Sequence, residues 1–149
     1  MISVMKRILG CLALGLVTIV ASAQWSDPAN QIPAYHIAPP TQPLPPVLSG
    51  DQLTGEYFSH PYQVIAYQMA AKIPKVLYQE PCYCHCDLAL KHTSLDSCFA
   101  GTHGAVCSTC MKEAVFTYQQ TKKGLTPKQI RAGIERGEWQ DIDLEAIKL

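Results

Sequence analysis

The sequence predicts a small all-α domain preceded by a signal peptide and a proline-rich arm. Apolar residues recur at helical spacing over residues 61–73 and 104–123, and prolines and capping residues mark the ends of these segments. No stretch of any length alternates apolar and polar residues as a half-buried strand does. We therefore expect a signal peptide over residues 1–23, a Pro-rich linker or arm over 24–50, and a helical domain with a Cys/His-rich loop over 51–149.

The first residues have the three parts of a secretory signal. Lys6 and Arg7 precede an apolar run over residues 8–20, and the small residues at 21–23 form a cleavage site. The run is shorter than the roughly 18 apolar residues that a membrane-spanning helix needs. The sequence therefore predicts an exported bacterial protein, periplasmic or extracellular, which contacts a membrane only if the signal is retained.

Composition limits the classes of partner and of activity. The 149 residues include 12 basic and 12 acidic side chains, so the formal net charge is zero. Nucleic-acid-binding proteins carry basic patches that neutralise phosphates, and we therefore expect no nucleic-acid partner. The chain also lacks a glycine-rich phosphate loop, a G-x-S-x-G motif and an H-E-x-x-H motif. Nothing outside the cysteine region indicates an enzyme.

The segment over residues 24–49 is dense in proline, which forbids a helix and favours an extended, solvated backbone. The simplest interpretation is a flexible spacer that contributes little to folding. The alternative is an arm, because Tyr35, His36 and Ile37 stand among these prolines and would allow the segment to lie across the domain.

The first helices of the domain are indicated by prolines and capping residues. Pro61 suits a first helical position, and the amphipathic stretch that follows ends before Pro74. Met69 on this stretch is assigned to the core rather than to a metal site. Thr93 or Ser94 would cap a short helix that continues through the next few residues.

A longer helix is expected from about residue 104 to Lys123, followed by a last one that Thr126 caps with Pro127 at its first position. In the longer helix apolar residues recur every three or four positions. The cysteines lie on the same face, so we expect them to face the interior. In the last helix Ile130 and Ile134 are expected to face inward.

Cysteine is the most informative residue type in this chain. Of the seven cysteines, Cys11 belongs to the signal and the other six lie between Cys82 and Cys110. An even number in a short stretch of an exported protein is typical of disulfides, and a dense mixture with histidine is typical of a metal site. Neighbouring thiols in a C-x-C pair close a strained ring, so disulfide partners would have to come from further along the chain.

Eight side chains are candidate ligands of a soft or borderline metal ion, zinc or copper. They are Cys82, Cys84, Cys86, His92, Cys98, His103, Cys107 and Cys110. His85 is expected to be a solvated loop residue.

The order of these residues resembles the PCYCGC-motif family, also described as CYCXC, of bacterial exported proteins. The resemblance rests on residues 81–86 (PCYCHC), followed by His92, Cys98, His103 and the Cys107-x-x-Cys110 pair. His85 stands where the motif's name has glycine. The resemblance implies a domain of uncharacterised function, with some relatives carrying selenocysteine in the motif, which favours redox or soft-metal chemistry.

Metal binding is the leading hypothesis, through Cys82, Cys84, Cys86, Cys107 and Cys110, with His92, Cys98 and His103 as alternates or neighbours. One alternative is a thiol-disulfide redox protein that uses Cys107 and Cys110 as a pair at a helix start. The other is an interaction module held by three disulfides, among which the sequence does not select.

Overall fold

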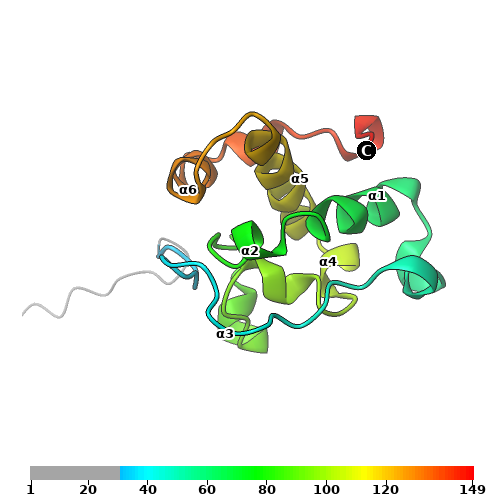
Figure 1. The fold of residues 1–149 in the computed structure, drawn as a ribbon. Coiled ribbons are helices and arrows are strands. Elements are labelled where there is room, and N and C mark those ends of the chain that lie inside the picture. The colour runs from blue at the N-terminus through cyan, green and yellow to red at the C-terminus, as the bar shows by residue number, and fades with distance from the viewer. Residues whose placement is uncertain (1–30) are drawn as a thin grey trace, which may run out of the picture.

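The computed structural model describes residues 31–149 and contains helices but no strand in this range, which confirms the all-α prediction (Figure 1). The predicted signal peptide lies outside these residues. No helix between residues 31 and 149 is long and apolar enough to cross a membrane. The α-helices are α1 (Pro61–Ala70), α2 (Pro74–Leu77), α3 (Cys86–Leu90), α4 (His103–Val106), α5 (Ser108–Lys122) and α6 (Pro127–Glu135). Short 3₁₀ segments occur at Gly50–Gln52, Glu56–Phe58, Leu95–Cys98, Glu138–Asp141 and Leu144–Ala146.

Helix α1 packs against α5 at the centre of the domain, and the other elements surround this pair (Figure 1). Tyr67 of α1 is fully buried, and its ring meets Phe58 and Phe99 edge to face, at centroid distances of 5.0 Å and 4.9 Å. Its hydroxyl donates a hydrogen bond to the carbonyl of Gly101 (2.6 Å) and accepts one from the amide of Ala105 (3.1 Å). Tyr67 therefore joins α1 to the loop and helix that carry part of the cysteine region.

The capping signals at two helices are confirmed. Pro61 is the first residue of α1, and Met69 is buried in the core as expected. At α6, Thr126 and Gln129 form a reciprocal capping box: the Thr126 amide donates to Gln129 Oε1 (2.9 Å), and the Gln129 amide donates to the Thr126 hydroxyl (3.4 Å). Ile130 and Ile134 of α6 are buried, as predicted.

The single helix expected from residue 104 to Lys123 is wrong in one respect, because it is interrupted at Cys107. Helix α4 ends at Val106, Cys107 adopts an extended conformation (φ −119°, ψ 107°), and α5 begins at Ser108. The side-chain amide (Nε2) of Gln63, on α1, donates a hydrogen bond to the backbone carbonyl of Ala105 (2.8 Å). Because this carbonyl lies at the end of α4, no amide of its own helix is available to it. The hydrogen bond from α1 takes the place of that missing bond and so stabilises the break.

The short element expected after Thr93 or Ser94 is a 3₁₀ segment, Leu95–Cys98, rather than an α-helix. Ser94 is its N-cap residue by position, but its side chain makes no capping hydrogen bond. Helices α2 and α3 were not predicted, because each is only four or five residues long and has no periodic pattern to detect.

The described part of the proline-rich segment is an arm that packs on the domain, so the flexible-spacer interpretation does not hold for residues 31–49. This segment, blue to cyan in Figure 1, runs past α2 and α3. His36 stacks on Tyr78, with ring centroids 3.8 Å apart, and the Tyr35 ring lies 4.4 Å from the guanidinium carbon of Arg131. Val47 is buried in the main core, and the Leu48 amide donates to the carbonyl of Phe99 (3.0 Å).

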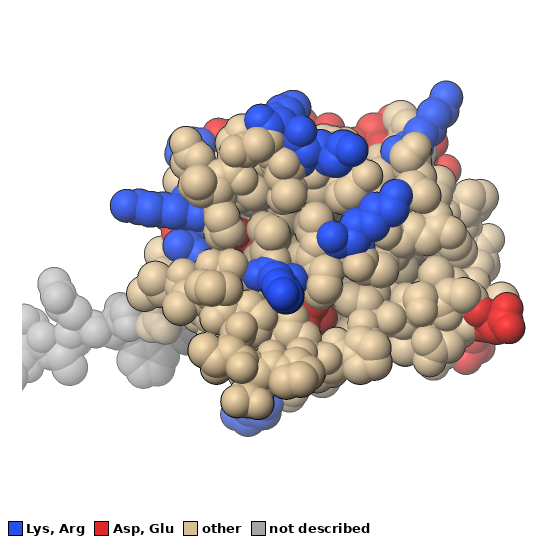
Figure 2. Space-filling view, viewed as in Figure 1, with Lys and Arg blue, Asp and Glu red and all other residues tan. Residues whose placement is uncertain are grey.

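Salt bridges contribute little to the stability of the part of the domain that the structure describes. On the face seen in Figure 2, Lys and Arg side chains are spread over a surface formed mostly by uncharged residues. Among residues 31–149 the structure contains one salt bridge, in which Arg136 Nη2 lies 2.7 Å from Glu138 Oε1, with both side chains exposed. Such an exposed pair contributes about 1 kcal/mol or less, so apolar burial stabilises the fold.

Candidate metal centre

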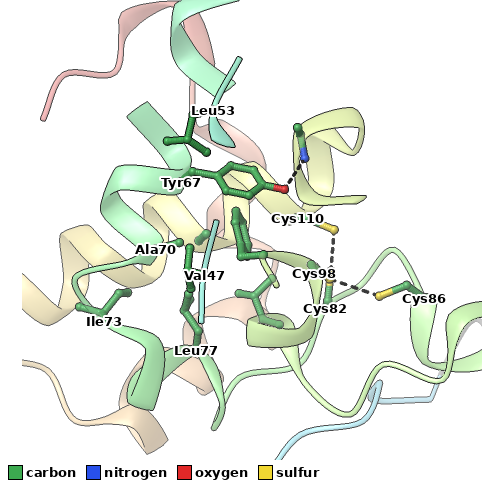
Figure 3. Packing of buried hydrophobic residues seen from close by; sticks show 14 of the residues in the cluster. Val47, Leu53, Tyr67, Ala70, Ile73, Leu77, Cys82, Cys86, Cys98 and Cys110 are labelled. Carbon is green, nitrogen blue, oxygen red and sulfur yellow. Dashed lines mark hydrogen bonds between the residues drawn. The ribbon is translucent and has the colours of Figure 1, made fainter. Parts of the chain in front are cut away.

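The thiols and imidazoles predicted as ligands come together at one side of the main core. Figure 3 shows four of them, Cys82, Cys86, Cys98 and Cys110. They arrive from separate elements. The loop at residues 82–85 leads into α3 at Cys86, His92 follows α3, and Cys98 ends the 3₁₀ segment that begins at Leu95. The remaining ones lie on or beside α4 and α5. We call the eight side chains the Cys/His cluster: Cys82, Cys84, Cys86, His92, Cys98, His103, Cys107 and Cys110.

Three thiols of the cluster form a triangle. The sulfur of Cys82 lies 3.3 Å from those of Cys84 and Cys110, and the latter two sulfurs are 3.5 Å apart. His103 Nε2 approaches the Cys84 sulfur at 3.7 Å. We call these four residues the Cys84 set. A disulfide would require a sulfur separation of about 2.05 Å, so these thiols are in contact without being linked.

A second group of contacts is centred on Cys98. Its sulfur lies 3.4 Å from that of Cys86 and 3.3 Å from His92 Nδ1. We call these three residues the Cys98 set. Cys98 and Cys86 are buried, and the rings of His92 and His103 meet edge to face at 5.2 Å, so the two sets adjoin.

Three overlapping groups of four ligand atoms each lie within 4.8 Å of one another. One contains Cys82, Cys84, Cys86 and Cys98; another contains Cys84, Cys98, His103 and Cys110; the third contains Cys86, His92, Cys98 and His103. Seven of the eight predicted ligands thus belong to at least one group whose four ligand atoms are close enough to bind one ion. All six cysteines from Cys82 to Cys110 are free thiols.

Cys107 differs from the other seven. It belongs to none of the three groups, it is half-buried at the break between α4 and α5, and it lines a surface pocket of about 430 Å³. Cys84, Cys86 and His103 line the same pocket, and Val106 on its lining is exposed. The cluster therefore has an opening to solvent through which an ion can enter.

The thiols influence one another's acidity. Hydrogen bonds from the thiols of Cys107, Cys110 and Cys82 lower the pKa of Cys84. The pKa of Cys110 is raised, because contacts with Cys107 and Cys82, among others, and burial favour its protonated form. A buried group of thiols cannot all ionise without a cation, so negative charge concentrates on some sulfurs while their neighbours keep their protons.

Two buried carboxyl groups near the cluster were not predicted as functional. Glu113 is fully buried, its Oε1 accepts a hydrogen bond from the amide of Tyr83 (2.9 Å), and burial raises its pKa to about 8. Burial also raises the pKa of Glu80 to about 9, an effect that Arg131 opposes. Glu113 ties the cysteine loop to α5. The sequence signal was its position three residues after Cys110, on the same helix face.

His85 is absent from the groups of ligand atoms and adopts a left-handed backbone conformation (φ 54°, ψ 32°) at the start of α3. Residues with a Cβ rarely adopt this conformation, whereas glycine does so freely. The backbone here thus has the geometry for which the motif's glycine is suited, and His85 occupies it under strain.

Replacing His85 by glycine is therefore expected to raise the free energy of unfolding by up to about 1 kcal/mol. Lys91, which ends α3 in the same conformation (φ 59°, ψ 29°), is a matched control, and Lys91→Gly should have a similar effect. Chemical denaturation of both variants without metal measures this. A loss of stability in His85→Gly alone would mean that the imidazole makes a stabilising contact.

Residues 49–141 match the family described as "Protein of unknown function with PCYCGC motif". Comparison with curated proteins and with solved structures found no match. The match spans the cysteine loop, the 3₁₀ segment that ends at Cys98 and all six α-helices. Because it covers more than half of the chain and includes every residue of the Cys/His cluster, the chain belongs to this family of PCYCGC-motif proteins.

Proposed function

We propose that this protein is exported and binds a soft or borderline metal ion, zinc or copper, through the side chains of the Cys/His cluster other than Cys107. The observation that carries the proposal is the triangle of unlinked thiols formed by Cys82, Cys84 and Cys110, with sulfurs 3.3–3.5 Å apart. Thiolates and imidazoles are the ligands that zinc and copper prefer.

The separation of the sulfurs supports ligation over disulfide formation. Two sulfurs bound to one tetrahedral ion with bonds of 2.3 Å lie about 3.8 Å apart, so the thiols of the triangle need to move apart by only a few tenths of an ångström. A disulfide would require them to approach by more than 1 Å. The sequence supports the rest of the proposal through the signal-like segment at residues 1–23.

Metal analysis and thiol alkylation test the proposal. Protein purified without chelator should contain zinc or copper by elemental analysis. Its cysteines should react slowly with iodoacetamide until a chelator is added, because bound metal shields thiolates from alkylation. Protein that contains no metal, and that binds none from added zinc or copper(I), would contradict the proposal.

The pH dependence of binding provides a second measurement. Ligation displaces protons from thiols. The affinity for zinc should therefore fall as the pH is lowered, because protons compete with zinc for the thiolates. A competition titration with a chromophoric chelator at several pH values measures this. An affinity independent of pH would exclude thiolate ligands.

The redox alternative is supported by one observation: Cys107 is the N-cap residue of α5, three residues before Cys110, and lines the pocket. Contact with Cys110 lowers the pKa of Cys107, but contact with Cys84 and burial outweigh it, and the net pKa is raised. A nucleophilic redox thiol needs a lowered pKa. Rapid alkylation of Cys107 alone, in metal-free protein that reduces a model disulfide, would favour the redox function.

A further inference from the structure

The Cys/His cluster offers more ligands than one ion takes. A zinc ion in a structural site is held by four protein ligands. Seven thiol or imidazole side chains belong to the three groups in which ligand atoms lie within 4.8 Å of one another. One ion would leave three of these side chains in contact with the site but without a cation.

The contacts divide these seven side chains into two sets that are each large enough for an ion. The Cys84 set supplies three thiols and the His103 imidazole, with contacts of 3.3–3.7 Å. The Cys98 set supplies two thiols and the His92 imidazole, with contacts of 3.3 Å and 3.4 Å. Each set therefore has at least three ligands of its own.

Cys98 lies where the two sets meet. It is the only residue present in all three groups of ligand atoms, and its side chain is fully buried. Its sulfur is within 4.8 Å of the sulfurs of Cys84 and Cys110 as well as in contact with Cys86. A thiolate sulfur has lone pairs enough to bind two soft ions at once, so Cys98 is placed to bridge one ion in each set.

The negative charge of the buried thiolates favours the binding of a second cation. The hydrogen bonds of these thiols in residues 31–149 are to other thiols and to His92 and His103, with no Lys or Arg side chain among them. Buried negative charge that no side chain neutralises is costly, so thiols beyond the four ligands of one ion can ionise only where a second cation binds them.

We propose that the Cys/His cluster, Cys107 excepted, is a binuclear centre that binds two zinc(II) or copper(I) ions. The three thiols of the Cys84 set bind one ion, and the Cys98 set together with His103 binds the other. The Cys98 thiolate bridges the two ions, so that each ion has four protein ligands. This proposal rests on the metal-binding function proposed above.

The number of ions per chain tests the proposal. The whole protein, reduced and kept free of oxygen, is titrated in one experiment with zinc sulfate and in another with copper(I) in acetonitrile. Native mass spectrometry and elemental analysis after gel filtration should find two ions per chain with at least one of these metals. A single ion with both metals would overturn the binuclear centre and leave metal binding standing, whereas no ion would overturn both proposals.

Variants assign the ions to the sets. The double variant Cys82→Ser/Cys110→Ser should reduce the stoichiometry from two to one, because it removes two of the three thiols of the Cys84 set. The double variant Cys86→Ser/His92→Ala should also reduce it from two to one, by removing ligands of the Cys98 set. Cys107→Ser is the matched control and should retain two ions, because Cys107 belongs to none of the ligand groups. Two ions in every variant would contradict the assignment.

A spectroscopic measurement on the protein without substitutions tests the thiolate bridge even if a variant fails to fold. Cobalt(II) is titrated in place of zinc, and its paramagnetic resonance signal is recorded. A shared thiolate couples the spins of two cobalt ions, so the signal should rise to an intermediate occupancy and fall as the second equivalent binds. A signal that grows in proportion to cobalt up to the second equivalent would mean that no bridge joins the ions.

Discussion

Removing the bound metal is expected to lower the free energy of unfolding by about 4 kcal/mol, at a free metal concentration about a thousand times the dissociation constant. The ligands come from three stretches of chain, residues 82–86, 92–98 and 103–110, which meet only in the folded protein. An unfolded chain cannot assemble the site, so metal binding free energy becomes folding free energy. Urea denaturation with excess zinc or with chelator measures the difference.

Two serine variants are the controls for this measurement. Cys110→Ser removes a fully buried thiol that touches both Cys82 and Cys84, so the stabilisation by metal should be clearly reduced. Cys107→Ser removes a half-buried thiol outside the ligand groups and should retain most of it. The sequence predicts only that each of these two substitutions disturbs the domain more than His85→Ala does. Equal losses in both variants would place Cys107 among the ligands.

Deleting residues 31–48 is expected to destabilise the domain by about 3 kcal/mol or more. Burial of Val47 contributes about 2 kcal/mol, and the hydrogen bond from Leu48 to Phe99 contributes about 1 kcal/mol. The stacking of Tyr35 on the Arg131 guanidinium adds about 1 kcal/mol. Chemical denaturation of the metal-free protein, with and without these residues, measures the loss.

A point substitution shows whether the effect comes from docking of the arm. Val47→Ala should account for a large share of the loss, because it removes buried carbon atoms from the main core. Ile37→Ala is the control, since Ile37 is 80% exposed on the same arm and should leave the stability unchanged. An unchanged denaturation midpoint in the deleted chain would mean that the arm is the flexible spacer suggested by its composition.

Local sequence signals predicted the elements whose causes are local. The start of α1 at Pro61 and the capping box of Thr126 with Gln129 at α6 involve residues within one turn of each other. Their energies are therefore present in the local sequence. The break at Cys107 and the docking of Val47 depend on Gln63 and Phe99, residues more than 40 positions away. No local pattern contains those interactions.

For the candidate site, the sequence by itself determined which side chains are available, because the PCYCHC run and the later Cys and His residues supply thiols and imidazoles in excess. It left metal binding, a redox pair and disulfides as alternatives. Only the tertiary structure decided which of these side chains lie close enough together to bind the same ion. It placed Cys98, which the sequence treated as an alternate ligand, in every group, and it left Cys107 at the edge of the pocket. The physical reason is that coordination depends on distances of a few ångströms between elements distant in the chain, and packing around Tyr67 and Phe99 sets those distances.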